Sequence, residues 1–187
     1  MKKIISLLVL LINLTVMAQK ECEYSSNVTD SLGTYKSTKD YMMHERVFAG
    51  NQTLIYFSLI NADGLLSLGV QIIQKSEGFV KANCFDKNSK IYLQLANGKI
   101  ISLIGIELDT CGNAFRVDNT NSRILSGYFL FVKDSFEDLK KSPISLMRIK
   151  FGTETVDYVI KEKLTSEVDK NTYFPENYFI NYLKCIE

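Results

Sequence analysis

Apolar and polar residues alternate along much of the chain with a period of two, which is typical of strands. The alternation is clearest on either side of Asp63-Gly64, a pair of residues that favours a two-residue β-turn. A hairpin around this turn places one set of apolar side chains on the same face: Ile55, Phe57, Leu59, Leu68, Val70 and Ile72. We therefore predict a hairpin with one buried face and one more polar face.

A second hairpin is predicted around Asn97-Gly98, where a two-residue turn places Leu95 opposite Ile100. Continued outward without a bulge, the same register places Cys84 opposite Cys111, within reach of a cross-strand disulfide. A polar stretch before the first strand can break the ladder, so this register alone does not decide the pairing.

A third hairpin is predicted at Gly152-Thr153, because Gly at the first loop position suits a type II′ turn. Its register brings Arg148 opposite Asp157 as a pair of opposite charges. A helix over 156–168 competes with this interpretation, since apolar residues recur there every four positions. The β-branched and aromatic residues after the turn favour a strand to about 161.

Further elements complete the predicted order. Three more strands are expected, at 40–48, 78–85 and 123–133. One short helix begins at Ser135, where Asp138 follows as in a capping box. Pro175 opens a C-terminal helix whose apolar face comprises Tyr178, Phe179, Tyr182, Leu183 and Ile186. The segments 23–37 and 112–122 are predicted to be loops.

These elements predict a mainly β fold. About nine strands with short turns and a docked C-terminal α-helix are typical of an antiparallel β-sandwich or an open barrel. The order of strands along the chain does not decide between these two topologies.

The first 18 residues have the pattern of a removable secretory signal peptide. Lys2 and Lys3 give a positive start, 4–17 are largely apolar, and Ala18 suits a signal peptidase. The apolar run is too short and too interrupted for a membrane span. We predict cleavage after Ala18, which leaves 19–187 as a single β-rich domain that is periplasmic or secreted.

Composition changes this picture little. Without 18 of its 187 residues the mature chain has 169, enough for one domain with its own core. The leader takes two of the 22 basic residues, which leaves 20 against 21 acidic ones. This balance gives no footprint for nucleic acid or an anionic membrane, and the oligomeric state stays open.

All four cysteines lie in the predicted mature chain, and an even number in an oxidising compartment predicts two disulfides. The hairpin register favours Cys84–Cys111, which leaves Cys22–Cys185 as a clasp between the two ends. By the loop-entropy model the shorter bridge contributes about 3–4 kcal/mol and the longer about 5 kcal/mol. The absence of CxxC and of Cys/His spacing argues against a redox or zinc site.

Candidate catalytic residues are few. His44, the single histidine, lies in a strand-like stretch without a catalytic motif, so we predict a surface or half-buried strand residue. Two carboxylates can act as acid and base without histidine, as in glycoside hydrolysis. Spacing singles out no pair among the nominal candidates Glu45, Glu77, Glu107, Asp109, Glu154 and Asp157. We therefore assign no catalytic, cofactor-binding or metal-binding residue.

Two weaker signals concern ligands. The stretch 118–122 has oxygen ligands at alternate positions but lacks the Gly and Glu of a calcium loop, so we predict a solvated loop. The chain has 10 Tyr, 11 Phe and no Trp, most of them on predicted core faces. Exposed aromatic rings can bind sugars or peptides, and the candidates here are Tyr92, Tyr128 and Tyr173.

The leader, the segment from Cys84 through Asn97-Gly98 to Cys111, and the closing stretch 182–186 resemble small exported proteins of Gram-negative bacteria whose function is unknown. The resemblance extends over the whole length and implies no functional residue. We expect a non-enzymatic exported protein that binds a macromolecular partner or a glycan. The alternatives are a small extracytoplasmic hydrolase that uses carboxylates, and an inhibitor or immunity protein that inserts 112–122 into a secreted enzyme.

Overall fold

The structure is a computed structural model that describes residues 21–31, 33–106, 109–132 and 135–187. The predicted signal peptide, 1–18, lies outside the described residues. Antiparallel strands dominate the described part of the chain. One large sheet contains β1 (Tyr24–Asp30), β2 (Gly33–Thr38), β3 (Tyr41–Phe48), β4 (Asn51–Ala62), β5 (Leu65–Ser76), β6 (Lys90–Leu95), β7 (Ile100–Gly105), β8 (Asn113–Val117), β9 (Thr120–Phe131), β10 (Ile144–Lys150) and β11 (Thr155–Val159). A separate hairpin pairs β12 (Leu164–Thr165) with β13 (Thr172–Tyr173).

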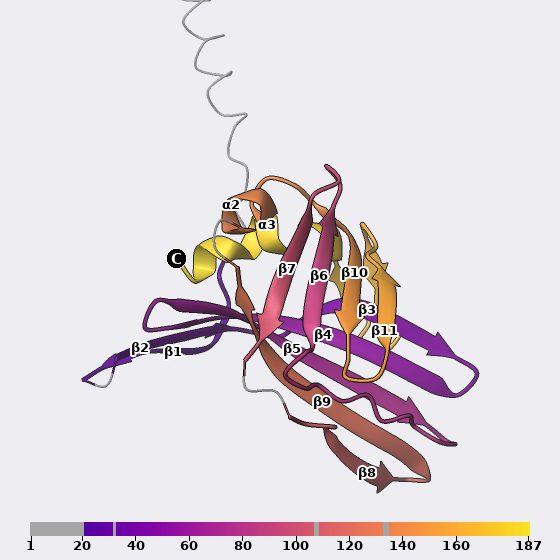
Figure 1. Ribbon diagram of the computed structural model, residues 1–187. Coiled ribbons are helices and arrows are strands. Elements are labelled where there is room, and N and C mark those ends of the chain that lie inside the picture. The colour runs from indigo at the N-terminus through magenta and orange to yellow at the C-terminus, as the bar shows by residue number, and fades with distance from the viewer. Residues whose placement is uncertain (1–20, 32, 107–108, 133–134) are drawn as a thin grey trace, which may run out of the picture.

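The large sheet bends sharply along its path. Its strand order is β1-β2-β4-β5-β9-β7-β6-β10-β11, with β3 also beside β4 and β8 also beside β9. Strands β7 and β9 pair over only a short stretch, from Leu103 opposite Phe131 to Gly105 opposite Phe129. Beyond this joint, β7, β6, β10 and β11 stand across β4, β5 and β9 (Figure 1). The fold is therefore mainly β, as predicted, and the sheet is open rather than closed into a barrel.

The hydrophobic core lies between the two halves of the bent sheet. The long strands contribute one layer, which includes Ile55, Phe57, Leu59, Leu68, Val70, Leu125 and Phe129. The crossing strands contribute the other, which includes Ile91, Leu93, Leu95, Leu103, Met147 and Ile149. Strands that are apolar on one face bury that face only by packing against another layer, which is why the sheet folds over on itself.

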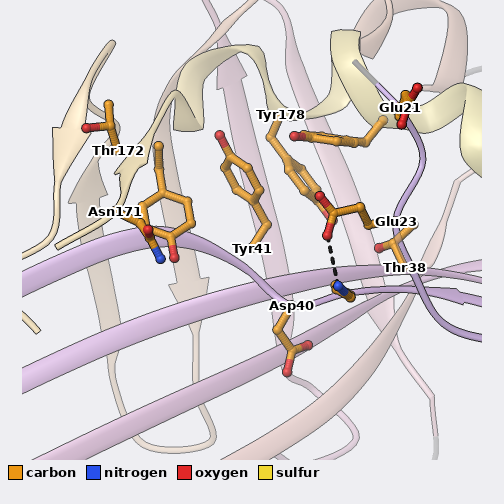
Figure 2. Close-up of a pocket in the computed structure, with 11 residues that line it drawn as sticks. Glu21, Glu23, Thr38, Asp40, Tyr41, Asn171, Thr172 and Tyr178 are labelled. Carbon is orange, nitrogen blue, oxygen red and sulfur yellow. Dashed lines mark hydrogen bonds and ion pairs between the residues drawn. The ribbon is translucent and has the colours of Figure 1, made fainter. Parts of the chain in front are cut away.

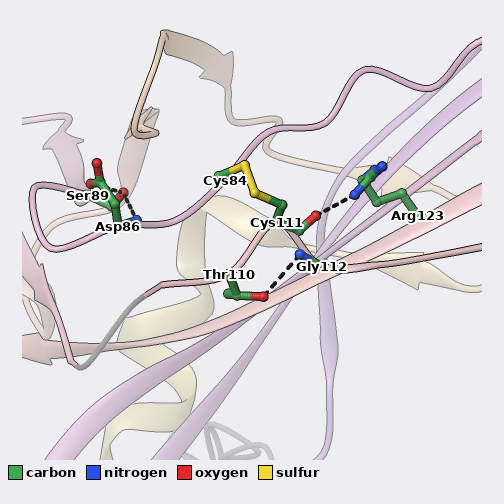
Figure 3. Close-up of a disulfide and its surroundings, with 7 residues drawn as sticks. All are labelled: Cys84, Asp86, Ser89, Thr110, Cys111, Gly112 and Arg123. Carbon is green, nitrogen blue, oxygen red and sulfur yellow. Dashed lines mark hydrogen bonds between the residues drawn. A yellow bond between two sulfur atoms is a disulfide. The ribbon is translucent and has the colours of Figure 1, made fainter.

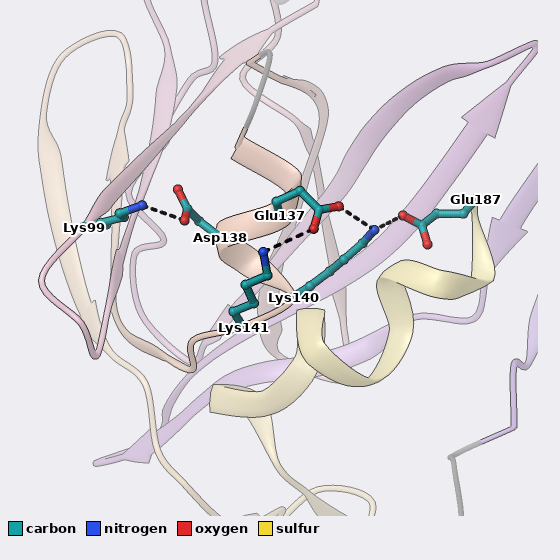
Figure 4. A network of polar contacts seen from close by, with 6 residues as sticks. All are labelled: Lys99, Glu137, Asp138, Lys140, Lys141 and Glu187. Atoms are coloured by element: carbon teal, nitrogen blue, oxygen red, sulfur yellow. Dashed lines mark hydrogen bonds and ion pairs between the residues drawn. The ribbon is translucent and has the colours of Figure 1, made fainter.

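The C-terminal segment closes one end of this core. It comprises η1 (Pro175–Asn177), α3 (Tyr178–Tyr182) and η2 (Leu183–Cys185), and its predicted apolar face is the face that packs inward. A second short helix, α2 (Ser135–Leu139), begins where it was predicted. Lys140, just after α2, forms ion pairs with Glu137 and with Glu187 at the chain end (Figure 4). None of the described helices has the length and apolarity that crossing a membrane requires.

Both predicted disulfides are present. Cys22 and Cys185 join the two ends of the described chain, with a Cα–Cα distance of 5.6 Å. Cys84 and Cys111 form the second bridge, and the carbonyl of Cys111 accepts a hydrogen bond from the Arg123 guanidinium at 2.7 Å (Figure 3). Two disulfides are typical of extracytoplasmic proteins.

Two of the three predicted hairpin registers are confirmed. Asn51 to Ala62 pairs with Ser76 to Leu65 without a break, and Asp63 and Gly64 both adopt the positive φ of a type I′ turn. Strands β10 and β11 also pair as predicted, and Arg148 binds both carboxylate oxygens of Asp157 at 2.6 and 2.7 Å. The competing helix over 156–168 is not formed.

The turn at Gly152 is not of the predicted type II′, because Gly152 does not have a positive φ. Its role is close approach: its N–H donates to the Cys84 carbonyl at 2.9 Å, and a Cβ atom would lie 2.9 Å from Asp86 Oδ2. Gly therefore lets this turn pack against the segment that follows Cys84.

The register predicted around Asn97-Gly98 is wrong by one residue. Ile100 pairs with Gln94 rather than Leu95, because the loop has three residues and only Gly98 has a positive φ. The observed register pairs Leu93 with Ile101, and both side chains are buried in the core. Burial of apolar side chains thus outweighs the turn preference of Asn-Gly. Farther out, the ladder breaks and an isolated bridge between Phe85 and Thr110 brings the two cysteines together.

Three local predictions are also corrected. The segment 78–85 is not a strand: only Phe85 forms a bridge, and Phe79 is 87% exposed. The predicted loop 23–37 forms β1 and β2 instead, and the predicted loop 112–122 contains β8 and the start of β9. Strands β1 and β2 are mostly polar and every residue of β8 is exposed, so these segments lack the regular alternation that marks a half-buried strand.

Candidate ligand-binding site

A pocket of about 510 Å³ lies where the two ends of the described chain meet, and we call it the tyrosine pocket (Figure 2). Four segments contribute to it: the stretch before β1, the β2–β3 connection, the end of the β12–β13 hairpin, and α3. It is lined by Glu21, Glu23, Thr38, Lys39, Asp40, Tyr41, Asn171, Thr172, Tyr173, Tyr178 and Tyr182.

The local folding of these segments explains why they meet. The Cys22–Cys185 disulfide ties the stretch that carries Glu21 and Glu23 to the C-terminal helices. The Tyr24 hydroxyl donates to the Cys185 carbonyl at 2.9 Å and reinforces this attachment. On the other side, Leu164 packs with Met42 and Leu54, which holds the β12–β13 hairpin and its Tyr173 against β3.

Four tyrosine rings contact one another at the pocket and form an aromatic wall, in which Tyr41, Tyr173 and Tyr182 are partly exposed and Tyr178 is buried in the core behind them. Tyr41 is central, with its ring centroid 5.1 Å from Tyr173 in a nearly perpendicular arrangement. The centroids of Tyr178 and Tyr182 each lie 5.2 Å from that of Tyr41. These separations are within the range of attractive aromatic contacts, so the rings position one another.

The tyrosine hydroxyls differ in their environments. The Tyr41 hydroxyl accepts a hydrogen bond from the Phe174 N–H at 2.7 Å, and the Tyr173 hydroxyl donates to Asp169. Burial, followed by this hydrogen bond to Asp169, raises the pKa of Tyr173 to about 12. The Tyr178 hydroxyl is buried and makes no hydrogen bond of normal geometry among the described residues, although Thr38 lies close enough to affect it. Its pKa is also raised, chiefly by burial.

Acidic groups also line the pocket. Glu23 forms an ion pair at 3.0 Å with Lys39, the one basic residue in the described part of the lining. Partial burial raises the pKa of Asp40, and a hydrogen bond with Ser58 acts in the opposite direction. The pocket therefore combines an aromatic wall with carboxylate, amide and hydroxyl groups that can donate or accept hydrogen bonds.

Comparison with known proteins finds no matching family model, curated protein or solved structure.

The residues considered from the sequence fall mostly elsewhere. Of the nominal acid/base candidates, none lines the tyrosine pocket, and Glu107 lies outside the described residues. Asp157 is paired with Arg148, and Glu154 with Lys81. Glu45 accepts a hydrogen bond from the Glu167 N–H at 2.8 Å. Asp157, Glu154 and Glu45 thus each have a different partner, and the structure does not bring these three described carboxylates together into one site.

His44 is half-buried in β3, as expected, with its ring 5.0 Å from that of Tyr158. Burial, followed by the positive charges of Lys161 and Arg46, lowers its pKa, and Glu45 acts in the opposite direction. The stretch 118–122 is not a loop throughout: Asp118 and Asn119 form the tight β8–β9 turn, and 120–122 begin β9. Among the described residues, no group of three or more His, Cys, Asp or Glu side chains is arranged to hold a metal ion.

The candidate tyrosines are separated. Tyr173 belongs to the tyrosine pocket, whereas Tyr92 lines a groove on the crossing strands and Tyr128 is an exposed residue of β9. Sequence reasoning found Tyr173 but missed Tyr41, Asp40 and Glu21. The available signal was the predicted Cys22–Cys185 clasp, which already placed the two ends of the chain side by side.

Proposed function

We propose that the protein is an exported, non-enzymatic binding protein that holds a glycan in the tyrosine pocket. The observation that carries this proposal is the set of three partly exposed tyrosine rings, Tyr41, Tyr173 and Tyr182, in a pocket that carboxylate and amide groups also line. A sugar ring offers an apolar C–H face to an aromatic ring and hydroxyl groups to polar side chains, so both kinds of surface in the pocket have a use.

The spacing of the rings favours a ligand that stacks against them over a ligand that is enclosed between them. Tyr178 and Tyr182 have centroids 5.5 Å apart, and both contact Tyr41. Rings that already touch one another leave no room for a ligand group between them, so the ligand packs against the wall from one side. A flat sugar ring suits such a surface better than a compact ligand that needs an enclosing cavity.

Export is supported by the two disulfides and by the leader pattern. The test is N-terminal sequencing of the protein recovered from the periplasm or medium of the producing cells, together with thiol counting. We expect the chain to begin at Gln19 and to have no free thiol. Retention of residues 1–18, or four free thiols, would contradict export with disulfide formation.

Glycan binding is tested by calorimetry of the mature protein against a panel of oligosaccharides, with Tyr173→Ala as the pocket variant. Removing one stacking ring is expected to weaken binding about tenfold, which corresponds to about 1.4 kcal/mol. Tyr128→Ala is the matched control, because Tyr128 is 52% exposed on another part of the sheet. Circular dichroism and thermal melting establish that both variants are folded.

The outcomes separate clearly. Binding that is weakened by Tyr173→Ala and unchanged by Tyr128→Ala supports the proposal. If no oligosaccharide binds, or if the two variants weaken binding equally, the tyrosine pocket is not a glycan site.

Hydrolysis is the second candidate, because Asp40, whose pKa is raised, shares the pocket with two glutamates. Both glutamates are exposed, and Glu23 is already paired with Lys39, which argues against a poised acid and base. Incubation with each bound oligosaccharide is expected to release no new reducing ends. Turnover that is lost in Asp40→Asn would replace the binding proposal with a hydrolase.

A further inference from the structure

Strand β11 has a free edge to which a further strand can be added. It is the last strand along the path of the large sheet, and among the described strands only β10 pairs with it. The Ile160 N–H donates to the Ser145 carbonyl at 3.1 Å, so the even-numbered residues of β11 bond to β10. The N–H and C=O groups of Thr155, Asp157 and Val159 therefore point away from β10, and all three residues are exposed.

The edge of β11 lacks the irregularity that interrupts two other edges of this sheet. A register shift breaks the pairing of β1 with β2 and of β3 with β4. Strand β11 pairs with β10 from Thr155 to Val159 without a shift. Bulges disrupt the regular row of N–H and C=O groups that another chain needs for pairing. The free edge of β11 is therefore a regular template for an additional strand.

A ledge formed by β3 and β4 extends outward from this edge. His44 of β3 lies against β11, with its ring 5.0 Å from that of Tyr158. Beyond His44, the same face of β3 carries Arg46 and Phe48, and β3 and β4 continue past β11 (Figure 1). Residues two apart on a strand are about 7 Å apart, and paired strands are about 4.8 Å apart, so a strand added to β11 would lie above Arg46.

The ledge is hollowed where the added strand would lie. A pocket of about 250 Å³ is lined by Arg46, Phe48, Asn51 and Thr53. Arg46 is paired with Thr53, and Phe48 with Asn51, so these four side chains share one face of the sheet. Phe48 is 68% exposed and forms the outer side of the hollow. An inward side chain of an added strand can therefore fill the space between β11 and Phe48.

Positive charge predominates around the hollow. The Arg46 guanidinium is exposed and forms no ion pair with a described residue. After burial, Lys161 and Arg46 contribute most to the lowered pKa of His44, and each outweighs Glu45. Glu45 itself belongs to the opposite face of β3, and Glu77 lies across the β3–β4 turn. The next two charges after Lys161 are of opposite sign and cancel: Glu162 and Lys163.

We propose that β11 and this ledge bind an extended acidic peptide of a protein partner, which adds a strand to the sheet and places a carboxylate against Arg46. In this mode of recognition, main-chain hydrogen bonds give affinity and hollows for alternate side chains give specificity. A peptide fits better than a second copy of the chain, because the ledges of two copies joined at β11 would collide. The site is separate from the tyrosine pocket, so neither proposal depends on the other.

The test begins with selection of heptapeptides from a random displayed library on the disulfide-bonded mature protein. The enriched peptide, made synthetically, is the probe. Hydrogen exchange followed by NMR is expected to slow at the amides of Thr155, Asp157 and Val159 when the probe binds. Two forms of the probe are N-methylated at alternate residues, one in each phase. The form that loses the N–H groups facing β11 should bind at least about ten times more weakly, and the other should bind as before.

Variants of the protein isolate the groups that recognise the probe. Val159→Pro removes an outward N–H that the β10 ladder does not use, whereas Val159→Ala keeps this N–H. Arg46→Gln removes the charge in the hollow, and Arg116→Gln removes a charge on β8. We expect the affinity to fall at least about tenfold in Val159→Pro and about three- to tenfold in Arg46→Gln, with little change in the two controls. Circular dichroism and thermal melting establish that the variants are folded.

Slower exchange at β11, together with the loss of affinity in Val159→Pro, supports the proposal. It is overturned if no peptide is enriched, if exchange slows at β8 or the tyrosine pocket instead, or if Val159→Pro binds the probe as tightly as the native protein. A probe whose acidic residue is replaced by its amide should bind about three- to tenfold more weakly, and equal binding would refute the acidic class. Exchange at β11 that slows with protein concentration alone would identify a second copy as the occupant.

Discussion

His44 shows how the environment of one residue sets its chemistry. It is the only histidine of the chain, and it lies between the ring of Tyr158 and the charges of Lys161, Arg46 and Glu45. Burial and two positive neighbours favour the neutral imidazole. Its sequence context predicted a strand residue without a catalytic partner, and its position in β3, away from the tyrosine pocket, fits a structural role.

The pKa of His44 determines how stability changes in mild acid. Because the pKa is lowered in the folded state, the unfolded chain takes up a proton first as the pH falls below about 6.5. The free energy of unfolding should therefore decrease from there through the folded-state pKa. Chemical denaturation across this range should show the decrease in the native protein and a smaller one in His44→Gln. NMR titration of the single imidazole gives the folded-state pKa directly, and a value above that of a model peptide would contradict this account.

At the scale of elements, hairpin registers were predictable where turn chemistry and apolar pattern agree. Asp63-Gly64 is such a case, since the two-residue turn also aligns the buried side chains. Around Asn97-Gly98 the two signals conflict, and the apolar pattern prevails through a three-residue loop. Strands β1 and β2 were missed because they are mostly polar, and β8 because all of its residues are exposed, so that neighbouring strands rather than their own sequences specify them.

Two glycines with positive φ provide a matched test of local packing. A Cβ atom at Gly98 would meet nothing within 4 Å, whereas at Gly112 it would lie 2.3 Å from the Ile124 carbonyl oxygen. Gly98→Ala should cost only the backbone strain, about 1 kcal/mol. Gly112→Ala should cost at least about 3 kcal/mol, because β9 must also shift. Equal losses in urea denaturation would mean that Gly112 does not pack against β9 as described.

The β12–β13 hairpin depends on a small apolar cluster. Leu164 is buried with Met42 and Leu54, so Leu164→Ala removes a large part of the contact that holds the hairpin to β3. We expect a loss of about 2 kcal/mol, at the low end for such a change because a small peripheral cluster can relax. Val168→Ala, in the same hairpin but 44% exposed, should stay within about 0.5 kcal/mol of the native protein. A Leu164→Ala variant as stable as the control would show that the hairpin does not depend on this cluster.

For the whole molecule, the tyrosine pocket depends on joining the two ends of the chain. Tyr41 comes from β3, Tyr178 from α3 and Glu21 from the segment beside Cys22. Because these residues lie far apart in the sequence, no local sequence motif identifies the site. The predicted disulfide between Cys22 and Cys185 indicated that these ends meet. The sequence could not indicate that four rings converge there, because that depends on how the β12–β13 hairpin folds back onto β3.

The two disulfides should differ in their effects. Cys22→Ser/Cys185→Ser opens the longer loop, worth nominally about 5 kcal/mol, and frees the pocket wall that carries Glu21 and Glu23. Cys84→Ser/Cys111→Ser removes about 3.5 kcal/mol by the same model but leaves the pocket lining in place. Measured below the melting temperature of each variant, ligand affinity should fall in the first and be retained in the second. The reverse order would place the binding site elsewhere.

The central claim is that the tyrosine pocket is the place where a glycan binds. The most direct measurement is NMR titration of isotopically labelled mature protein with an oligosaccharide that binds in calorimetry. We predict saturable chemical-shift changes centred on Tyr41, Tyr173 and Tyr182, with Tyr128 unchanged. Saturable changes centred instead on Phe115 and Val117 of β8, with the pocket signals unmoved, would contradict the claim.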